Sequence, residues 1–367
     1  MKRTGFLYEK MCDKEVIRKA IIMASRHKRR RKTVKRILKN IDAYVDELHT
    51  MMVNETFTPS PYHRFQIKDG ATQKVREICC PKFYPDQIVH WIAILAVQPV
   101  LTKGMYEFNC GSVPGRGPHY GKKYVERWFK RDRKHTKYCL KLDIRKFYPS
   151  LKAPVVMREL RRVIKCQRTL RLLETILKSE DGLPIGNYTS QWFANFALQR
   201  LDHFIKEKLQ IKHYIRYMDD MCLFGNNKRK LHRAREAIQQ FLDGMQLTLK
   251  GNWQVFPIKS RAVDFLGFRF FREKTIFRRN LSLRLRRRVK KAYQQLLRTG
   301  RVNYNNAAAV MSYLGWLLHA DCQWFYEKYI RPYLTSIKKI KEVIRHESRV
   351  RSKTAVILGG PSTVLAV

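Results

Sequence analysis

Three aspartates stand in apolar surroundings within a strongly basic sequence. Asp219 and Asp220 lie at the centre of HYIRYMDDMCLFG (213–225), and Asp143 lies in CLKLDIRKFY (139–148). Carboxylates avoid apolar surroundings unless a cation offsets the loss of their hydration. That cation is either a bound divalent metal or a basic side chain. The candidate side chains nearest in the sequence are Arg216, Arg145 and Lys146.

Each of the two sequences places its acids at the end of an apolar strand pattern. Two such strands paired in one antiparallel sheet would bring Asp143 close to Asp219, where like charges need a cation. Oxygen ligands select Mg²⁺, and a pair of these ions about 3.5–4 Å apart supports in-line phosphoryl transfer. Ion pairs alone would explain either site separately. The two sites together, in a chain this basic, favour the metal.

Composition indicates a folded protein with a polyanionic partner. The 367 residues include 76 Lys and Arg against 30 Asp and Glu, a formal net charge of +46, with 44% hydrophobic and 12% aromatic residues. This apolar content is enough for a packed core. The excess of positive charge predicts nucleic acid as the partner. A membrane is disfavoured, because no apolar run reaches about 18 residues.

The eight cysteines show no CxxC pair, and we expect no secretory leader. We therefore expect reduced thiols and a cytoplasmic protein. A zinc site is the alternative, but its candidate ligands match no known zinc spacing. These ligands would be Cys110, His119, His135 and Cys139.

Sequence patterns predict the elements that position the acids. An alternating strand is expected at 137–151, and a β-hairpin at 213–225 with the two aspartates at its tip. Apolar residues at helical spacing predict helices around them. The other expected elements are a basic helix over 26–48, an extended segment at 56–67, a strand and helix at 74–87, a core helix at 88–101, a helix at 228–243, a second hairpin at 262–280 and helices from 281.

Several motifs in one order carry a family resemblance. The YMDD hairpin, preceded by DIRKFYPS (143–150) and GLPIGNYTSQ (182–191), resembles motifs A, B and C of a reverse transcriptase palm. FLGFRFF (265–271) resembles the primer-grip hairpin of that family. KVREI (74–78) and GSVPGRGPHYG (111–121) resemble its fingers segments.

The resemblance implies an α+β fold, a right-hand polymerase with fingers, an antiparallel-sheet palm and a helical thumb. The implied divisions are a basic helical extension at 1–59, fingers at 60–136, a palm at 137–272, a helical thumb at 273–347 and a flexible tail at 348–367.

The GLPIGNYTSQ stretch distinguishes subfamilies. Group II intron, retron and retroviral enzymes have Gln where this chain has Ile185, and usually Pro where it has Gln191. An aliphatic residue followed by Gly186, three variable positions and Ser-Gln is similar to the reverse transcriptases of diversity-generating retroelements. We expect no maturase or endonuclease domain after the thumb, and NAAAV (306–310) is not the retron element, because Val310 stands where His is required. The resemblance thus implies error-prone copying, with misincorporation opposite template adenines.

Metal ligands follow from the matched motifs. The resemblance implies that Asp143 and Asp219 bind two Mg²⁺ ions, with Mn²⁺ as an alternative ion. The carbonyl of Ile144 would help. Asp220 is expected to bind more weakly, because adjacent strand residues point to opposite faces.

Nucleotide-binding residues are carried over in the same way. Tyr148, five residues after Asp143, would lie under the sugar and exclude a ribonucleotide hydroxyl. Lys74 and Arg76 resemble the cations near the incoming triphosphate. Ile185, Gly186 and Gln191 would form the loop beside the incoming dNTP. Lys250 or, alternatively, Lys259 would be the lysine of motif D, the general acid for pyrophosphate departure.

The implied partners are a template RNA, an RNA/DNA primer–template duplex, dNTPs and a small basic helical accessory variability protein. Two alternatives remain open. One is another bacterial reverse transcriptase, derived from a group II intron or associated with defence. The other is a catalytically idle RNA-binding scaffold, which the presence of all three aspartates disfavours.

Overall fold

The structure, a computed structural model, describes residues 3–68 and 75–357. It divides into two compact units. Unit 1 combines Met1–Gly121 with Lys134–Pro257, and unit 2 combines Lys122–Arg133 with Ile258–Val367. Within the described ranges, no helix is long and apolar enough to span a membrane.

Unit 1 begins with helices packed around one apolar helix. That helix, α5 (Ile88–Thr102), is the core helix that the sequence predicts, and α1 and α2 pack against it. On the basic helix α3, Val34 and Ile37 are buried at helical spacing while its lysines face solvent. The helices are α1 (Leu7–Cys12), α2 (Lys14–Ser25), α3 (Lys32–Lys39) and α4 (Ile41–Val53).

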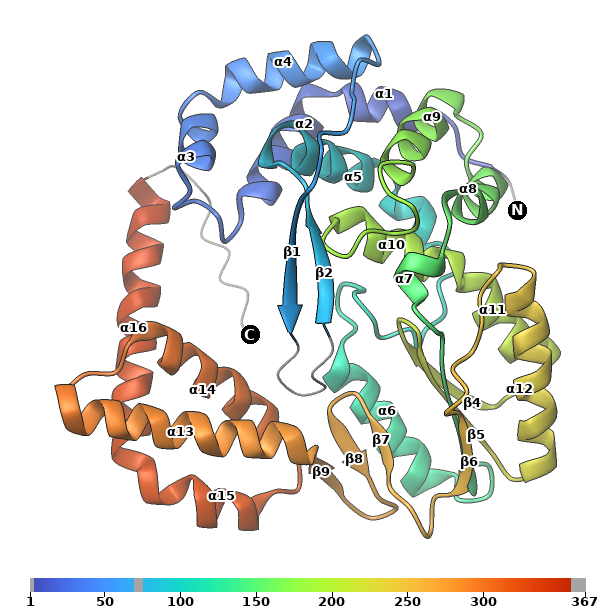
Figure 1. The fold of residues 1–367 in the computed structure, drawn as a ribbon, viewed down its shortest axis with the longest axis vertical. Helices are drawn as coiled ribbons and strands as arrows, with labels where there is room; N and C mark the ends of the chain where they lie inside the picture. Colours follow the sequence, from blue (N-terminus) through green and yellow to red (C-terminus); the bar gives the residue numbers. More distant parts are fainter. Residues whose placement is uncertain (1–2, 69–74, 358–367) are drawn as a thin grey trace. The chain divides into compact units, whose positions relative to one another are not determined.

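A long two-stranded hairpin connects these helices. Its strands, β1 (His63–Lys68) and β2 (Val75–Cys80), are antiparallel (Figure 1). All six residues of β1 are exposed, so the hairpin contributes little to the core. An irregular turn at Phe83–Gln87 then leads into α5.

An antiparallel sheet holds the predicted acids. Its strand order is β4–β5–β3–β6, with bounds of Tyr138–Asp143 for β3, His213–Tyr217 for β4, Asp220–Gly225 for β5 and Gln254–Pro257 for β6. The helices that accompany it in unit 1 are α7 (Phe147–Ser150), α8 (Ala153–Val163), α9 (Gln167–Leu177), α10 (Tyr188–Ala197), α11 (Gln199–His203), a π-helical turn (Phe204–Lys208) and α12 (Lys228–Asp243).

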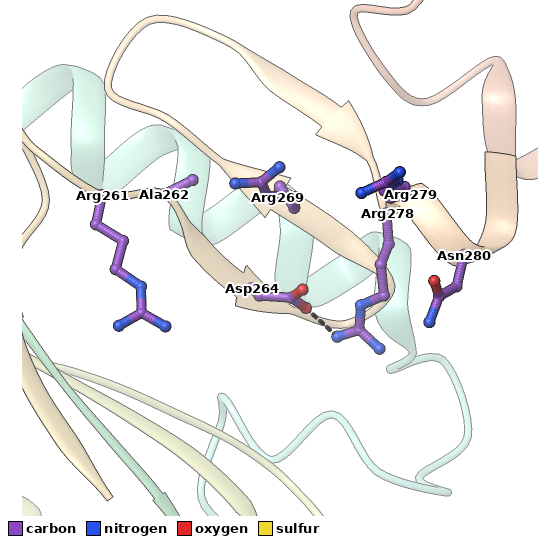
Figure 2. Close-up of a pocket in the computed structure, with 7 residues that line it drawn as sticks. All are labelled: Arg261, Ala262, Asp264, Arg269, Arg278, Arg279 and Asn280. Carbon is purple, nitrogen blue, oxygen red and sulfur yellow. Dashed lines mark ion pairs between the residues drawn. The ribbon is translucent and has the colours of Figure 1, made fainter. Parts of the chain in front are cut away.

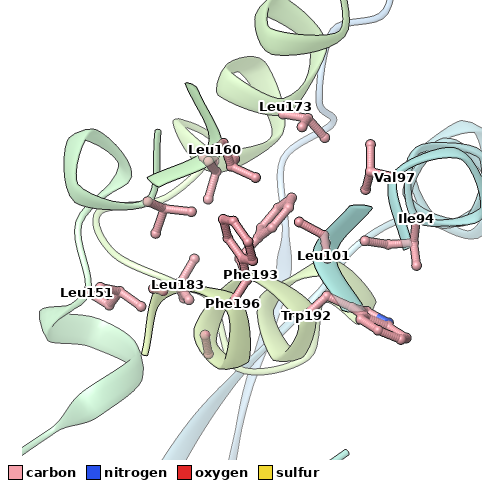
Figure 3. Packing of buried hydrophobic residues seen from close by; sticks show 14 of the residues in the cluster. Ile94, Val97, Leu101, Leu151, Leu160, Leu173, Leu183, Trp192, Phe193 and Phe196 are labelled. Atoms are coloured by element: carbon pink, nitrogen blue, oxygen red, sulfur yellow. The ribbon is translucent and has the colours of Figure 1, made fainter. Parts of the chain in front are cut away.

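The core of unit 1 gathers around α10. Figure 3 shows Phe193 and Phe196 of this helix among leucines of neighbouring segments, with Ile94 and Val97 of α5 nearby. Phe193 is fully buried. Truncating such a residue to Ala typically costs about 3–5 kcal/mol. Leu183, in the loop that precedes α10, belongs to the same core cluster, so this packing helps to hold the loop.

Unit 2 contains a small sheet and a group of long helices. The strands β7 (Val263–Phe265), β8 (Phe268–Phe270) and β9 (Thr275–Phe277) form one antiparallel sheet in that order. Helix α13 packs on α14, and α14 on α16. The helices are α6 (Pro118–Arg131), of which the residues from Lys122 belong to unit 2, α13 (Arg279–Thr299), α14 (Tyr304–Leu317), α15 (Gln323–Tyr329), a 3₁₀ turn (Arg331–Tyr333) and α16 (Leu334–Ile357).

One expectation about this region needs correction, and two expected domain bounds can be compared with the structure. The second hairpin is a three-stranded sheet, because TIF (275–277) pairs with β8. The expected palm boundary at 272 does not separate compact units: β7 and β8 belong to unit 2, since they pair with β9 and not with β6. The expected tail at 348–367 starts inside α16, because helix-breaking residues appear only at Gly359 and beyond. Residues 358–367 lie outside the described ranges.

Candidate active site

The two acidic segments meet in one sheet, as the sequence predicts. Strand β3 pairs antiparallel with β5, and Asp143 is aligned with Asp220 at the end of the ladder. Strands β4 and β5 form the predicted hairpin, whose two connecting residues are Met218 and Asp219. Alternating residues Leu140 and Leu142 are buried and hold β3 in this register.

Asp219 is the acid most affected by its surroundings. Burial, and next the charge of Asp143, raise the pKa of Asp219 from 3.8 to about 6, while the charge of Lys250 opposes this rise. The two carboxyl groups therefore lie close enough to repel each other when both are ionised. This is the juxtaposition that the strand pattern predicts.

Lys250 joins this pair. Its Nζ lies 2.5 Å from Oδ2 of Asp143, and its backbone N–H donates to the carbonyl of Asp143 over 2.8 Å. A β-bridge between Ile144 and Leu249 holds the two segments together. Of the two lysines that the sequence offers for motif D, Lys250 is thus the one beside Asp143. Lys259 lies in unit 2.

Asp220 has a different neighbour. Its Oδ2 lies 3.5 Å from Nζ of Lys141, two residues before Asp143 on β3. Among the residues that the structure describes, no group of three or more His, Cys, Asp or Glu side chains forms a metal cluster. The close carboxyl pair is that of Asp143 and Asp219, whereas Asp220 lies beside the ammonium group of Lys141.

All eight cysteines are free thiols.

Arg216 does not neutralise the aspartates of the hairpin tip. Its guanidinium, fully buried, forms an ion pair with Asp202, with Nη2 2.5 Å from Oδ2 and Nε 2.8 Å from Oδ1. The interpretation that Arg216 serves as the counterion of Asp219 is therefore wrong. Asp143, in turn, finds its cation in Lys250 across 107 positions of sequence.

Tyr148 lies near Asp219, and its role under the sugar of a nucleotide stays a prediction. It is partly buried, and burial, followed by the charges of Asp219 and Tyr217, raises the pKa of its hydroxyl. Its carbonyl accepts a hydrogen bond from the N–H of Leu183 over 2.9 Å. Tyr148 thus links the acid pair to the loop at 183–187.

The loop that carries Ile185 is fixed by strand β2. The carbonyl of Ile185, whose side chain is half-buried, accepts from the N–H of Cys79 over 2.8 Å. Gly186 has φ of 131°, and a Cβ on it would lie 2.2 Å from the carbonyl oxygen of Cys79. Both the close approach and the backbone conformation require glycine here. On the helix that follows, Gln191 is exposed.

The two basic residues that are predicted to contact the triphosphate of the nucleotide are Arg76 and Lys74. Arg76 is exposed on β2, opposite Ile67. Lys74 lies outside the described residues. Their role near a triphosphate stays a prediction.

The chemistry of the acid pair fits a hard divalent cation. Oδ1 of Asp143 is buried and accepts no hydrogen bond from the part of the chain that the structure describes. A buried carboxylate oxygen of this kind needs a partner. Together with the raised pKa of Asp219, it marks a place where a cation bound by oxygen would relieve an unfavourable arrangement.

Sequence reasoning missed Lys141 and the buried pair of Asp202 and Arg216. Asp202 stands in LQRLDHFIKE (198–207), a helical pattern with acids and bases on one turn, which is typical of a solvated face. In the structure it is fully buried. Its position on the apolar side of the helix, beside Leu198 and Leu201, was the available signal.

Unit 2 carries a basic pocket of its own, of about 270 Å³ (Figure 2). Four arginines and one aspartate contribute to it, and Asp264 is ion-paired with Arg278. Helix α13 begins here, and a helix N-terminus attracts anions. The lining residues are Arg261, Ala262, Asp264, Arg269, Arg278, Arg279 and Asn280.

Comparison with solved structures supports a polymerase fold with helices and antiparallel sheets. The apo telomerase of Candida tropicalis is similar over 81% of this chain and 59% of that chain, with 12% identity and a TM-score of 0.50. The telomerase of Candida albicans, in complex with a fragment of telomeric RNA, is similar over 78% of this chain and 59% of that chain, with 13% identity and a TM-score of 0.45. The chain thus spans about three fifths of the length of these telomerase chains.

A search of curated proteins found no match. The family described as reverse transcriptase (RNA-dependent DNA polymerase) matches residues 67–270, which include the whole β4–β5–β3–β6 sheet and the acid pair. This match covers more than half of the chain, so the protein belongs to the reverse transcriptase (RNA-dependent DNA polymerase) family.

Proposed function

We propose that this chain is an RNA-directed DNA polymerase that copies a retroelement template RNA into cDNA. The observation that carries the proposal is the close pair of Asp143 and Asp219 at the ends of paired strands. The family match agrees with it. The match supports reverse transcription and leaves the subfamily to be tested.

Asp143, Asp219 and the carbonyl of Ile144 would hold two Mg²⁺ ions, with Asp220 as the weaker ligand. The ions would supply charge stabilisation for in-line transfer of a nucleotide to a primer hydroxyl. Asp220 would have to release Lys141 to contribute. Asp143 would likewise have to release Lys250 at Oδ2, so the weaker role of Asp220 rests on its orientation, opposite to that of Asp219 on the chain.

Other residues near the pair have roles in orienting the nucleotide and moving a proton. Lys250 would donate a proton to the departing pyrophosphate, and its contact with Asp143 supports this role. Tyr148, beside Asp219, would exclude the 2′-hydroxyl of a ribonucleotide by contact with its ring. Arg76 and Lys74 would contact the triphosphate.

The template RNA and the primer–template duplex are the proposed partners of the basic surfaces. The net charge of +46 favours binding to phosphates by release of counterions. In unit 2, the arginine-lined pocket and the exposed cations of α13 suit a nucleic-acid backbone. In unit 1, α3 presents further lysines.

We further propose that copying is error-prone, especially opposite adenines, as in diversity-generating retroelements. Ile185 has no polar side chain to reward a correct base pair with a hydrogen bond. An apolar contact distinguishes ligands by only about 1–3 kcal/mol. A small basic helical accessory protein would assist. Another bacterial reverse transcriptase remains the second candidate.

Primer extension separates these candidates. Purified protein is incubated with Mg²⁺, dTTP and oligo-dT annealed to poly-rA, and then with a mixed-sequence RNA template whose cDNA is sequenced. Errors concentrated at template adenines support the proposed subfamily, and accurate cDNA supports the second candidate. An absence of DNA synthesis, with and without the accessory protein, by a chain that still binds the template RNA would favour an RNA-binding scaffold and overturn the proposal.

A further inference from the structure

The hairpin turn that carries Asp219 contains a residue in an unfavourable backbone conformation. Met218 has φ of 55° although it is not glycine. In a two-residue hairpin loop, a positive φ at the first central residue is the arrangement that normally selects glycine. Such conformations persist only where the surrounding structure holds them.

Arg216 provides one of the contacts that hold this turn. Its Nη1 donates to the carbonyl of Met218 over 3.0 Å. The charge of Arg216 is matched elsewhere, by the two oxygens of Asp202, which also accepts from the hydroxyl of Tyr214 over 2.8 Å. The ion pair therefore fixes the guanidinium, and Nη1, which makes no contact with Asp202, donates to the main chain of the turn.

Asn195 extends this contact to the opposite side of the turn. Its Oδ1 accepts from Nη1 of Arg216 over 3.2 Å, and its Nδ2 donates to the carbonyl of Gly111 over 2.5 Å. Gly111 lies directly against Met218: a Cβ on Gly111 would come within 2.6 Å of the backbone nitrogen of Met218. The contacts close a ring that runs through Arg216, Asn195, Gly111 and Met218.

We infer that this ring sets the position of Asp219, with Arg216, Asn195 and Gly111 as positioning residues for the acid pair. The inference rests on the proposed function for its link to DNA synthesis. It concerns residues that do not themselves contact the reacting atoms. The ring explains why a fully buried charge pair stands next to the turn: an apolar pair could fill the space but could not donate to the carbonyl of Met218.

Gly111→Ala tests the ring without replacing either residue of the ion pair. The added methyl group must displace Met218, and the turn with it. Gly117→Ala is the matched control, because it is the same substitution in the same loop and a Cβ there meets nothing within 4 Å. Neither glycine has a positive φ, so neither change strains its own backbone.

A second variant, Asp202→Asn combined with Arg216→Met, removes both buried charges together. This avoids leaving one charge unpaired, which is the strongly destabilising case. The amide that replaces the carboxylate still offers an oxygen to the hydroxyl of Tyr214, so the change mainly removes the donor to the turn. Melting temperatures would check whether each variant is folded at the assay temperature, and Gly111→Ala decides the matter if the double variant is not.

The readouts are kcat and KM for one nucleotide addition, Kd for the primer–template duplex, and Mn²⁺ affinity measured by electron paramagnetic resonance. We expect kcat to fall at least tenfold and Mn²⁺ to bind more weakly in Gly111→Ala and in the double variant. Duplex Kd should stay within twofold, and Gly117→Ala should match wild type. A merely structural ion pair would leave kcat and Mn²⁺ affinity unchanged in folded variants, and that result would overturn the inference.

The Mn²⁺ arm separates this inference from the proposed function. A wild-type protein that binds Mn²⁺ but makes no DNA would refute the function. Mn²⁺ binding that is weaker in Gly111→Ala than in wild type and Gly117→Ala would then still support the inference that the ring positions Asp219. A wild-type protein that neither binds Mn²⁺ nor makes DNA would overturn both.

Discussion

The ammonium group of Lys250 lies 2.5 Å from Oδ2 of Asp143, and the backbone N–H of the same lysine donates to the carbonyl of the same aspartate. Two contacts from one residue fix the segment after α12 against the end of β3. The lysine thereby stands beside both members of the acid pair, since its charge also acts on Asp219.

Two substitutions of Lys250 should distinguish the effect of its positive charge on the rate of nucleotide addition from the effect of proton donation. Lys250→Met should lower the rate of nucleotide addition by about 10²–10⁴-fold, the usual contribution of a general acid. Lys250→Arg keeps a positive charge for Asp143, but a guanidinium does not release its proton. It should therefore be nearly as slow as Lys250→Met. Rapid-quench measurement of single additions checks this, and a wild-type rate in Lys250→Arg would exclude proton donation by Lys250.

The raised pKa of Asp219 predicts a pH-dependent stability of the metal-free protein. The folded state keeps a proton on Asp219 up to about pH 6, whereas the unfolded chain releases it near pH 4. The unfolding free energy should therefore decrease as the pH rises through this window, by up to about 3 kcal/mol, and then level off. Urea titrations between pH 4 and pH 8 measure this decrease.

Asp219→Asn is the control for that titration, because it removes the ionisable group and keeps the shape. The difference in stability between Asp219→Asn and wild type should grow from pH 4 to pH 6. Added Mg²⁺ should stabilise wild type more at pH 8 than at pH 5, since the ion and the proton compete for the carboxylate. A pH-independent difference would show that Asp219 has an ordinary pKa.

Charge reversal on α13 should weaken duplex binding for all sequences alike. Arg287 and Lys290 are exposed on this helix, whereas Arg286 lies 4.4 Å from the ring of Tyr329 and is left unchanged. The double change to Glu should flatten the plot of log K against log salt concentration by about 0.9 for each phosphate that the protein no longer neutralises. Arg287→Lys with Lys290→Arg is the charge-preserving control. An equal salt slope in all three proteins would place these residues outside the nucleic-acid interface.

Ile185→Gln should make DNA synthesis more accurate. A glutamine at this half-buried position can hydrogen-bond to a correctly paired nucleotide, provided that Gly186 keeps the loop against Cys79. Ile185→Leu is the apolar control and should keep the wild-type error spectrum. Sequencing cDNA from one adenine-rich RNA template compares the three proteins. Identical spectra for wild type and Ile185→Gln would mean that fidelity is determined elsewhere.

The local pattern of apolar residues was sufficient to predict the secondary-structure elements that carry the acids. The hairpin at 213–225 and the helix at 228–243 appear as predicted, because alternating and helical periodicities were strong there. The antiparallel pairing of β3 with β5 followed from two apolar strands that each end in an acid. These signals depend on neighbours in sequence, which a single chain displays directly.

Long-range contacts were not visible in the same way. The sequence left Lys250 and Lys259 as alternatives, because the bridge between Ile144 and Leu249 has no local signal. The ion pair between Arg216 and Asp202 likewise depends on packing between a helix and a strand, which the local sequence does not reveal. The extent of α16 was underestimated because the end of a weakly periodic helix depends on its stop signal.

DNA synthesis by variants of the acid pair tests the central claim most directly. Wild type, Asp143→Asn, Asp219→Asn and the surface control Asp46→Asn are compared on one RNA template with Mg²⁺, with duplex Kd measured in parallel. Asp46 is exposed and pairs with Lys14 on the surface of unit 1, so its loss should have little effect. The account predicts synthesis at background level for both Asp143→Asn and Asp219→Asn, with duplex Kd near wild type and full activity in Asp46→Asn. Clear synthesis above background by either variant of the pair would contradict it.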